Sequence, residues 1–179
     1  MRDLGLLLVR LVVGGLLAGH GAQKLFGWFA GPGLEGAGGW MESLGLKPGQ
    51  RWAAMAGLGE FGGGTLTALG FLHPVGPITM LGPMIVAWGK VHKGKPIWVT
   101  EGGAELPMTN IAIAVALALA GPGNYSLDRV FGRCPAPWLT ALAAAAVAGG
   151  MIVGAVAERA MHADDDAEAE AEAGTDTPA

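Results

Sequence analysis

The polar residues that could do chemistry in this chain of 179 residues lie inside or at the ends of long apolar stretches. Residues 14–29, GGLLAGHGAQKLFGWF, place His20, Gln23 and Lys24 within about one helical turn of each other. An imidazole exchanges a proton near neutral pH, and a carboxamide or an ammonium group donates hydrogen bonds to a ligand oxygen. One interpretation of the cluster is therefore a proton or hydrogen-bond partner for a ligand.

Two further charges interrupt the apolar stretches. Arg10 lies well inside the first stretch, and Glu60 lies in the middle of the second, in GLGEFGGG. Because a charge at the centre of a membrane helix costs about 2.5–3.5 kcal/mol on insertion scales, a pairing of Arg10 or Lys24 with Glu60 is expected. Glycines surround Glu60, and Gly15 and Gly19 offer a matching small-residue face for close helix packing.

Two interpretations of these charges stay open. One is a structural ion pair that fixes the first helix to the second. The other is a polar pocket between helices in which Glu60 or His20 binds a ligand. His20 can also be a hydrogen-bonded histidine at a helix end. No HxxxH or HxxE spacing is present, so we expect no metal site even though His92, Glu101 and Glu105 lie near one border.

The composition favours an all-α, polytopic transmembrane helical bundle. Hydrophobic residues make up 51% of the chain, and the mean hydropathy is +0.44. Five apolar segments are expected to form helices, the third and fourth being short for the ~20 residues of a span. The fourth alternates as a strand might, but its Ala and Leu residues favour helix. The segments are residues 4–26, 52–72, 75–88, 106–120 and 138–157.

Gly- and Pro-rich loops are expected at residues 27–39, 89–107 and 121–137, and tryptophans lie near the predicted membrane borders. The distribution of Lys and Arg puts the C-terminus in the cytoplasm and the N-terminus outside. Arg10 and His20 argue against a cleaved signal peptide in the first segment. The single cysteine, Cys134, excludes an intrachain disulfide framework.

The charge of the chain is divided unevenly. Residues 158–179 contain eight acidic residues and one base, whereas the rest of the chain contains ten bases and seven acids. A low-complexity acidic segment of this kind is expected to be solvated and disordered, and its simplest role is to solubilise. No basic run indicates binding to nucleic acid.

Three stretches, in this order, resemble the DoxX family of small bacterial membrane proteins. They are LLLVRLVVGGLLAGHGAQKLFG (6–27), MAGLGEFGGGTLTALGFL (55–72) and ELPMTNIAIAVALALAGPGNYSLDRVF (105–131). The resemblance covers about residues 4–132 and implies a four-helix bundle in the cytoplasmic membrane. It assigns no catalytic role to the matching polar positions, which are the candidate binding residues Arg10, His20, Gln23, Lys24, Glu60 and Glu105.

The resemblance also implies a link to redox chemistry. One branch of the family resembles a subunit of thiosulfate:quinone oxidoreductase. Another is associated with a membrane complex of a superoxide dismutase and a thiosulfate sulfurtransferase, and others with quinone or catechol stress. We therefore expect a DoxX-like membrane domain at residues 1–132, an additional transmembrane helix at 133–157 and an acidic tail at 158–179, in the bacterial inner membrane.

The leading hypothesis is a redox-linked membrane component that binds a quinone or quinol between the first and second helices and serves oxidative or thiol stress defence. In it, His20 and Glu60 hydrogen-bond the head group, and Arg10 or Lys24 sets their charge. The alternative is a non-catalytic scaffold that recruits soluble redox or detoxifying enzymes. A small-solute transporter is less favoured because no inverted repeat is visible. Enzymatic activity and homo-oligomer formation stay open.

Overall fold

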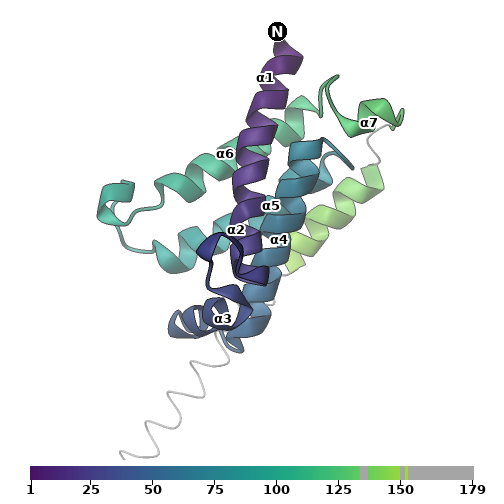
Figure 1. Cartoon of the computed structure of the whole chain (residues 1–179). Coiled ribbons are helices and arrows are strands. Elements are labelled where there is room, and N and C mark those ends of the chain that lie inside the picture. The colour runs from purple at the N-terminus through teal and green to yellow at the C-terminus, as the bar shows by residue number, and fades with distance from the viewer. Residues whose placement is uncertain (134–136, 150–151, 153–179) are drawn as a thin grey trace, which may run out of the picture.

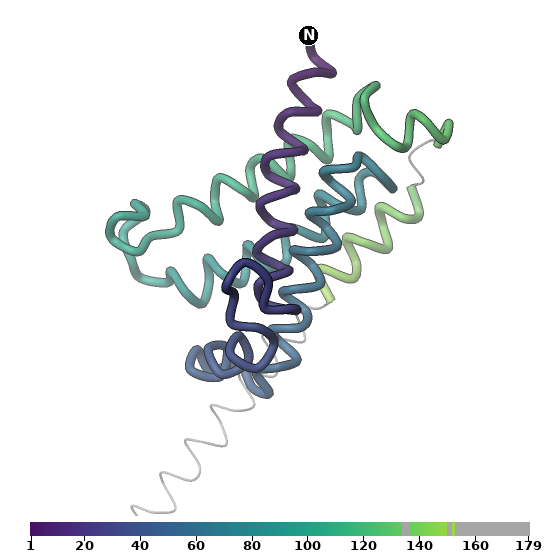
Figure 2. The backbone as a smooth tube through the Cα atoms, in the orientation of Figure 1, coloured from purple at the N-terminus to yellow at the C-terminus, as the bar shows by residue number. Residues whose placement is uncertain are grey.

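The computed structural model describes residues 1–133, 137–149 and 152, and all regular secondary structure in these residues is helical. The chain begins with one continuous rod of three helical segments: α1 (Arg2–Val9), the π-helical turn η1 (Arg10–Gly14) and α2 (Gly15–Phe26). This rod runs beside the other long helices in Figures 1 and 2. The expected all-α class is confirmed for the described residues.

The remaining helices follow the rod in chain order. A short 3₁₀ turn leads into a helix at one end of the bundle, two long helices form a hairpin, and a fourth long helix slants across them (Figure 1). They are η2 (Trp28–Ala30), α3 (Gly33–Ser43), α4 (Gly49–Leu69), α5 (Val75–Val86), η3 (Ala87–Val91), η4 (Val99–Glu101), α6 (Glu105–Ala120), α7 (Leu127–Val130) and a last helix, Pro137–Gly149.

The predicted apolar segments lie largely on helices as far as the chain is described. The fourth segment forms α6, with Pro107 in its first turn, so the helical interpretation of its alternating sequence is confirmed. The fifth segment is helical over Pro137–Gly149, and its end lies outside the described residues, together with the acidic residues 158–179. The domain division at residue 132 stays a prediction.

The prediction that residues 27–39 form a loop was wrong, because α3 begins at Gly33. Glycine lowers helix propensity, but α3 gains stability by packing an apolar face on the start of α4. Ala37 and Met41 are buried in a cluster with Leu46 and Ala53. Tertiary packing therefore outweighs local propensity in this segment.

Only one of the described helices, Arg2–Phe26, is both long and apolar enough to cross a membrane by itself. Three others are apolar but have 10–17 residues: Val75–Val91, Glu105–Ala120 and Pro137–Gly149. Many large apolar side chains are exposed, and five of the six tryptophans are at least 45% exposed. The helical surface has the apolar character of a membrane protein.

The contact between α2 and α4 brings two backbones together. A Cβ placed on Gly14 would lie 2.6 Å from the carbonyl oxygen of Gly64, and one on Gly21 would lie 2.6 Å from the carbonyl oxygen of Gly57. No side chain fits at such distances, so these positions require glycine. The helices run in opposite directions, with residue 14 beside 64 and residue 21 beside 57.

The prediction that Gly15 and Gly19 form this contact face was wrong, because a Cβ on either glycine would meet nothing within 4 Å. The buried positions of the rod are Arg10, Gly14, Leu17, Gly21 and Ala22, and the first four share one helical stripe. The sequence places glycines on two neighbouring stripes of the rod. The stripe that also carries Arg10 and Leu17 is the buried one, so its glycines contact α4.

α4 uses glycines on a second face for its contact with α5. A Cβ on Gly59 would lie 2.9 Å from the ring of Pro83, and one on Gly63 would lie 3.0 Å from the carbonyl oxygen of Gly76. α4 therefore sits between α2 and α5. α5 in turn packs against α6, and Met80 is fully buried in the resulting core.

Replacing Gly21 by alanine tests this packing. We expect Gly21→Ala to lower stability by about 1–3 kcal/mol, because the added methyl group forces the backbones of α2 and α4 apart. Gly19→Ala is the matched control on the same helix and is expected to be neutral or slightly stabilising, since it adds helix propensity in open space. Thermal unfolding of both variants in detergent measures the difference, and equal melting temperatures would contradict the account.

Candidate functional site

The structure pairs Glu60 of α4 with Lys24 of α2. The ammonium nitrogen Nζ lies 2.5 Å from the carboxylate oxygen Oε2, and the side chains of Lys24 and Glu60 are 21% and 6% exposed. A charged pair this deeply covered is stable only when its partners stay together, because removing either one leaves a buried charge alone. Of the two expected partners for Glu60, the structure selects Lys24.

The register of the glycine contact explains this choice. Gly21 lies against Gly57 and Phe61, so Glu60 lies at the level of Gly21. Lys24 lies one turn further along α2, and its long side chain leans back toward the start of the helix and reaches Glu60. Arg10 lies fourteen residues earlier on the rod, which is roughly 21 Å along a helix axis. Its guanidinium therefore lies near the opposite end of α4.

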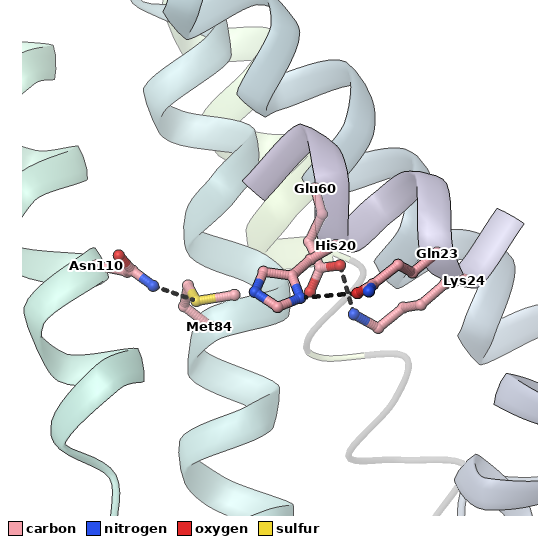
Figure 3. A network of polar contacts seen from close by, with 6 residues as sticks. All are labelled: His20, Gln23, Lys24, Glu60, Met84 and Asn110. Atoms are coloured by element: carbon pink, nitrogen blue, oxygen red, sulfur yellow. Dashed lines mark hydrogen bonds and ion pairs between the residues drawn. The ribbon is translucent and has the colours of Figure 1, made fainter. Parts of the chain in front are cut away.

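His20 and Gln23 lie on the exposed side of this ion pair. The Nδ1 atom of His20 lies 3.2 Å from Oε1 of Gln23, a contact in which Nδ1–H donates to the amide oxygen. In the neutral ring this leaves Nε2 as an acceptor, and a second proton would turn it into a donor. Figure 3 shows the imidazole next to the Glu60 carboxylate. The exposed ring can therefore accept or donate a proton beside a buried carboxylate.

Backbone contact at Gly21 and Gly57 leaves no room for a ligand head group at that level between α2 and α4. His20 lies on the exposed side of this contact. The binding site between the first and second helices stays a prediction, and the polar residues that would form it lie at the edge of the contact.

A second polar cluster surrounds Arg10, which is 3% exposed. Its guanidinium donates hydrogen bonds to the carbonyl oxygens of Pro122 and Tyr125, in the segment that follows α6. Gly70 makes room for it, since a side chain there would collide with the guanidinium, and its φ of +60° favours glycine. Arg10 is thus bound to backbone and does not pair with Glu60.

Sequence reasoning missed two members of this Arg10 cluster, His73 and Asp128. The Asp128 carboxylate accepts hydrogen bonds from the backbone N–H groups of Leu72 and His73, at 2.9 and 2.8 Å. Nε2 of His73 lies 3.1 Å from the carbonyl oxygen of Ala118 and donates to it. The signal in the sequence was SLD at 126–128, in which Ser126 caps α7. These bonds join the α4–α5 turn to the end of α6 and to the segment after it.

Glu105 lies apart from both clusters. Its Oε2 atom accepts a hydrogen bond from the backbone N–H of Val99 at 3.0 Å, next to a loop in which Nδ1 of His92 contacts the carbonyl oxygen of Gly102. In the described part of the chain, no three His, Cys, Asp or Glu side chains are grouped so that they could hold a metal ion. The contact of Glu105 is therefore with the backbone of the neighbouring loop, and Glu105 does not join the other candidate binding residues.

An apolar groove of about 200 Å³ lies between α4, α5 and the helix Pro137–Gly149. Gly59 and Pro83 line it, whereas their neighbours Glu60 and Met84 do not. The one hydroxyl in its wall, on Thr79, donates to carbonyl oxygens of its own helix. The groove is mostly apolar, and the indole N–H of Trp52 adds one hydrogen-bond donor to its lining.

Residues 5–93, about half of the chain, match the sequence model of the DoxX family. This range contains the rod from Gly5 onward, α3, α4, α5 and η3. It therefore includes His20, Gln23, Lys24 and Glu60. Comparison with curated proteins and with solved structures gave no match.

The buried histidine of the Arg10 cluster makes stability depend on pH. Burial lowers the pKa of His73 below its ordinary value of 6.5, and the charge of Arg10 adds to this; the Ala118 contact and Asp128 oppose it. The unfolded chain therefore binds a proton below about pH 6.5 more readily than the folded chain does. Stability should be unaffected by this group above that pH and should fall as the pH drops below it.

Replacing His73 by glutamine tests this dependence, because the amide N–H can still donate to Ala118. We expect the melting temperature of the wild type to decline more steeply between pH 6.5 and 5 than that of His73→Gln. Groups that titrate in both proteins cancel in the comparison. Identical slopes would show that His73 does not contribute.

Proposed function

The chain belongs to the DoxX family, and on that premise we propose that it is a multi-pass protein of the bacterial cytoplasmic membrane that binds a quinone or quinol in redox-linked stress defence. The observation that supports this proposal most directly is the buried Lys24–Glu60 pair beside an exposed imidazole. The group provides fixed charge, hydrogen-bond donors and a site for a proton within one turn of α2.

The expected depth of the Lys24–Glu60 pair in the membrane matches the depth at which a polar head group would lie. The midpoint of the Arg2–Phe26 helix is residue 14, and Lys24 lies ten residues away, or roughly 15 Å along the axis. Half the thickness of the hydrocarbon layer is also about 15 Å. Lys24 and Glu60 would therefore lie near the membrane border, where a head group meets water and its chain enters the lipid.

Several helices would have to cross the membrane with less than a full span of residues. Val75–Val91 has a length of roughly 25 Å, which is short of the ~30 Å hydrocarbon layer. Local thinning of the bilayer and tryptophans at the borders accommodate such a difference at small cost. The exposed tryptophans near the ends of these helices support this arrangement.

The residues present fit a quinone head group by the chemistry of their donors. The ammonium group of Lys24 has three N–H bonds, of which one points to Glu60, and His20 provides a ring nitrogen. A bound quinone would supply a redox couple that takes up and releases protons together with electrons. His20 would hold or release a proton at Nε2, and Lys24 would hold the Glu60 carboxyl group in position.

The scaffold is the rival proposal. It depends on the acidic residues 158–179, which lie outside the described residues. The arrangement of His20, Lys24 and Glu60 supports ligand binding, so we favour the quinone proposal.

The experiment is to measure the quinone content of the protein purified in mild detergent, for the wild type, Glu60→Gln and His20→Ala. We expect each variant to lose most of the bound quinone, because a hydrogen bond to a charged group contributes about 1.5–3 kcal/mol, or roughly 10- to 100-fold in affinity.

Glu105→Gln and His92→Ala are the matched controls, since they remove the same side-chain types from the loop side of the bundle. They should keep the wild-type content. Quinone at the wild-type level in Glu60→Gln and His20→Ala, or its absence from the folded wild type, would overturn the proposal.

A further inference from the structure

We infer that a small cavity beside Arg10 binds one resident water molecule, which accepts a hydrogen bond from the Nε–H group of Arg10 and donates to His73 and Thr67. The cavity belongs to the Arg10 cluster and lies apart from the Lys24–Glu60 pair, so the site does not depend on a quinone. Its ligand class is a small neutral molecule that both donates and accepts hydrogen bonds.

The buried guanidinium of Arg10 has one donor more than its protein partners use. Nη1 donates to the carbonyl oxygen of Pro122 and Nη2 to that of Tyr125. These two bonds fix the plane of the guanidinium and therefore the direction of its Nε–H bond. In the described residues, Nε of Arg10 is the one buried side-chain nitrogen or oxygen without a hydrogen-bond partner. An unpaired buried donor costs about 1–3 kcal/mol, and more in a charged group, so a partner is expected there.

A cavity of about 10 Å³ adjoins Arg10, at the place where the rod, α4, α5 and α6 meet. This is close to the ~10–15 Å³ that a single water molecule needs. Three of the residues that line it have polar side chains, and these are Arg10, Thr67 and His73, which are 3%, 1% and 8% exposed. Because so small a space has one occupant, the three side chains share the same molecule.

The neighbours of Arg10 in this cavity can accept hydrogen bonds. Nε2 of His73 donates to the carbonyl oxygen of Ala118, so Nδ1 of the neutral ring is an acceptor. The Thr67 hydroxyl donates to the sulfur of Met80 at 3.1 Å, and its oxygen can still accept. A water molecule that accepts from Arg10 and donates to both acceptors makes three hydrogen bonds, as buried waters typically do.

The charges around the cavity disfavour an ion. A cation would be repelled by the guanidinium of Arg10. An anion would add a second negative charge close to the buried carboxylate of Asp128, which already acts on the charge of Arg10. It would also face the lone pairs of His73 and Thr67, which attract a hydrogen-bond donor. Water fits both the size and the polarity of the space.

This water would complete the junction of the long helices at this end of the bundle. It would join the rod through Arg10, α4 through Thr67 and the α4–α5 turn through His73, whose ring is itself bound to α6 at Ala118. Four segments would then be linked through one molecule that none of them can replace.

The test is the cross-relaxation between the Arg10 Nε–H proton and water, measured by NMR on the full-length, arginine-labelled protein in detergent. Measurement in both the laboratory and the rotating frame separates dipolar contact from proton exchange. We expect a cross peak with the sign of a long-lived water. Arg133 is the internal control, since its exposed guanidinium lies over the ring of Phe71, where water exchanges rapidly. Its Nε–H should show no such peak.

Filling the cavity should remove the water. Thr67→Ile keeps the branch at Cβ, replaces the hydroxyl by a methyl group and adds a second methyl of about the size of the cavity. We expect the Arg10 cross peak to be lost in this variant. Thr79→Ile is the matched control, because Thr79 lines the separate apolar groove and its hydroxyl bonds within α5. It should keep the cross peak.

A cross peak present in the wild type and in Thr79→Ile but lost in Thr67→Ile supports the site. Its absence from the folded wild type overturns the inference, whatever the variants do. A peak of full intensity in folded Thr67→Ile overturns the assignment of the water to this cavity. Should Thr67→Ile fail to fold, Thr67→Val removes the hydroxyl without adding volume. It is expected to weaken the peak, and an unchanged peak would again overturn the assignment.

Discussion

The close approach of α2 and α4 is the constraint on which the rest of the structure depends. At Gly14 and Gly21 the two backbones touch, so the helices cannot slide or rotate past each other without a collision. This register sets the partners of two charges of the rod, with Lys24 beside Glu60 and Arg10 beside Gly70. α4 approaches α5 closely in the same way, at Gly59 and Gly63. The rod, α4 and α5 therefore form a three-helix core.

Two charges of the rod, buried Arg10 and half-buried Lys24, have different surroundings. The guanidinium of Arg10 binds carbonyl oxygens of the segment after α6, and Asp128 binds the neighbouring turn. This cluster joins segments far apart in sequence and is structural. The pair of Lys24 and Glu60 lies beside an exposed histidine. Buried charge next to an accessible proton carrier is the pattern of a functional site.

Local sequence patterns predicted the helices well and their contacts incompletely. Apolar segments of helical length located the rod, α4, α5 and α6, but α3 was missed because its stability comes from packing on Ala53. Small residues on two stripes of the rod could not show which stripe meets α4. His73 and Asp128 were missed because their partners lie 45 to 56 residues away in the chain, where spacing carries no signal. The sequence limited the ion-pair partner of Glu60 to Arg10 or Lys24. Only the register of the two helices could show which of them it is.

The most direct test of the account is the quinone content of a double variant, Lys24→Met with Glu60→Met, purified in mild detergent. Replacing both members of a buried ion pair by apolar side chains often leaves stability unchanged or raises it, and the glycine contact would still hold α2 to α4. The account predicts a folded protein that has lost its quinone. A folded double variant that retains the wild-type content would show that the pair only joins the two helices, and would contradict the central claim.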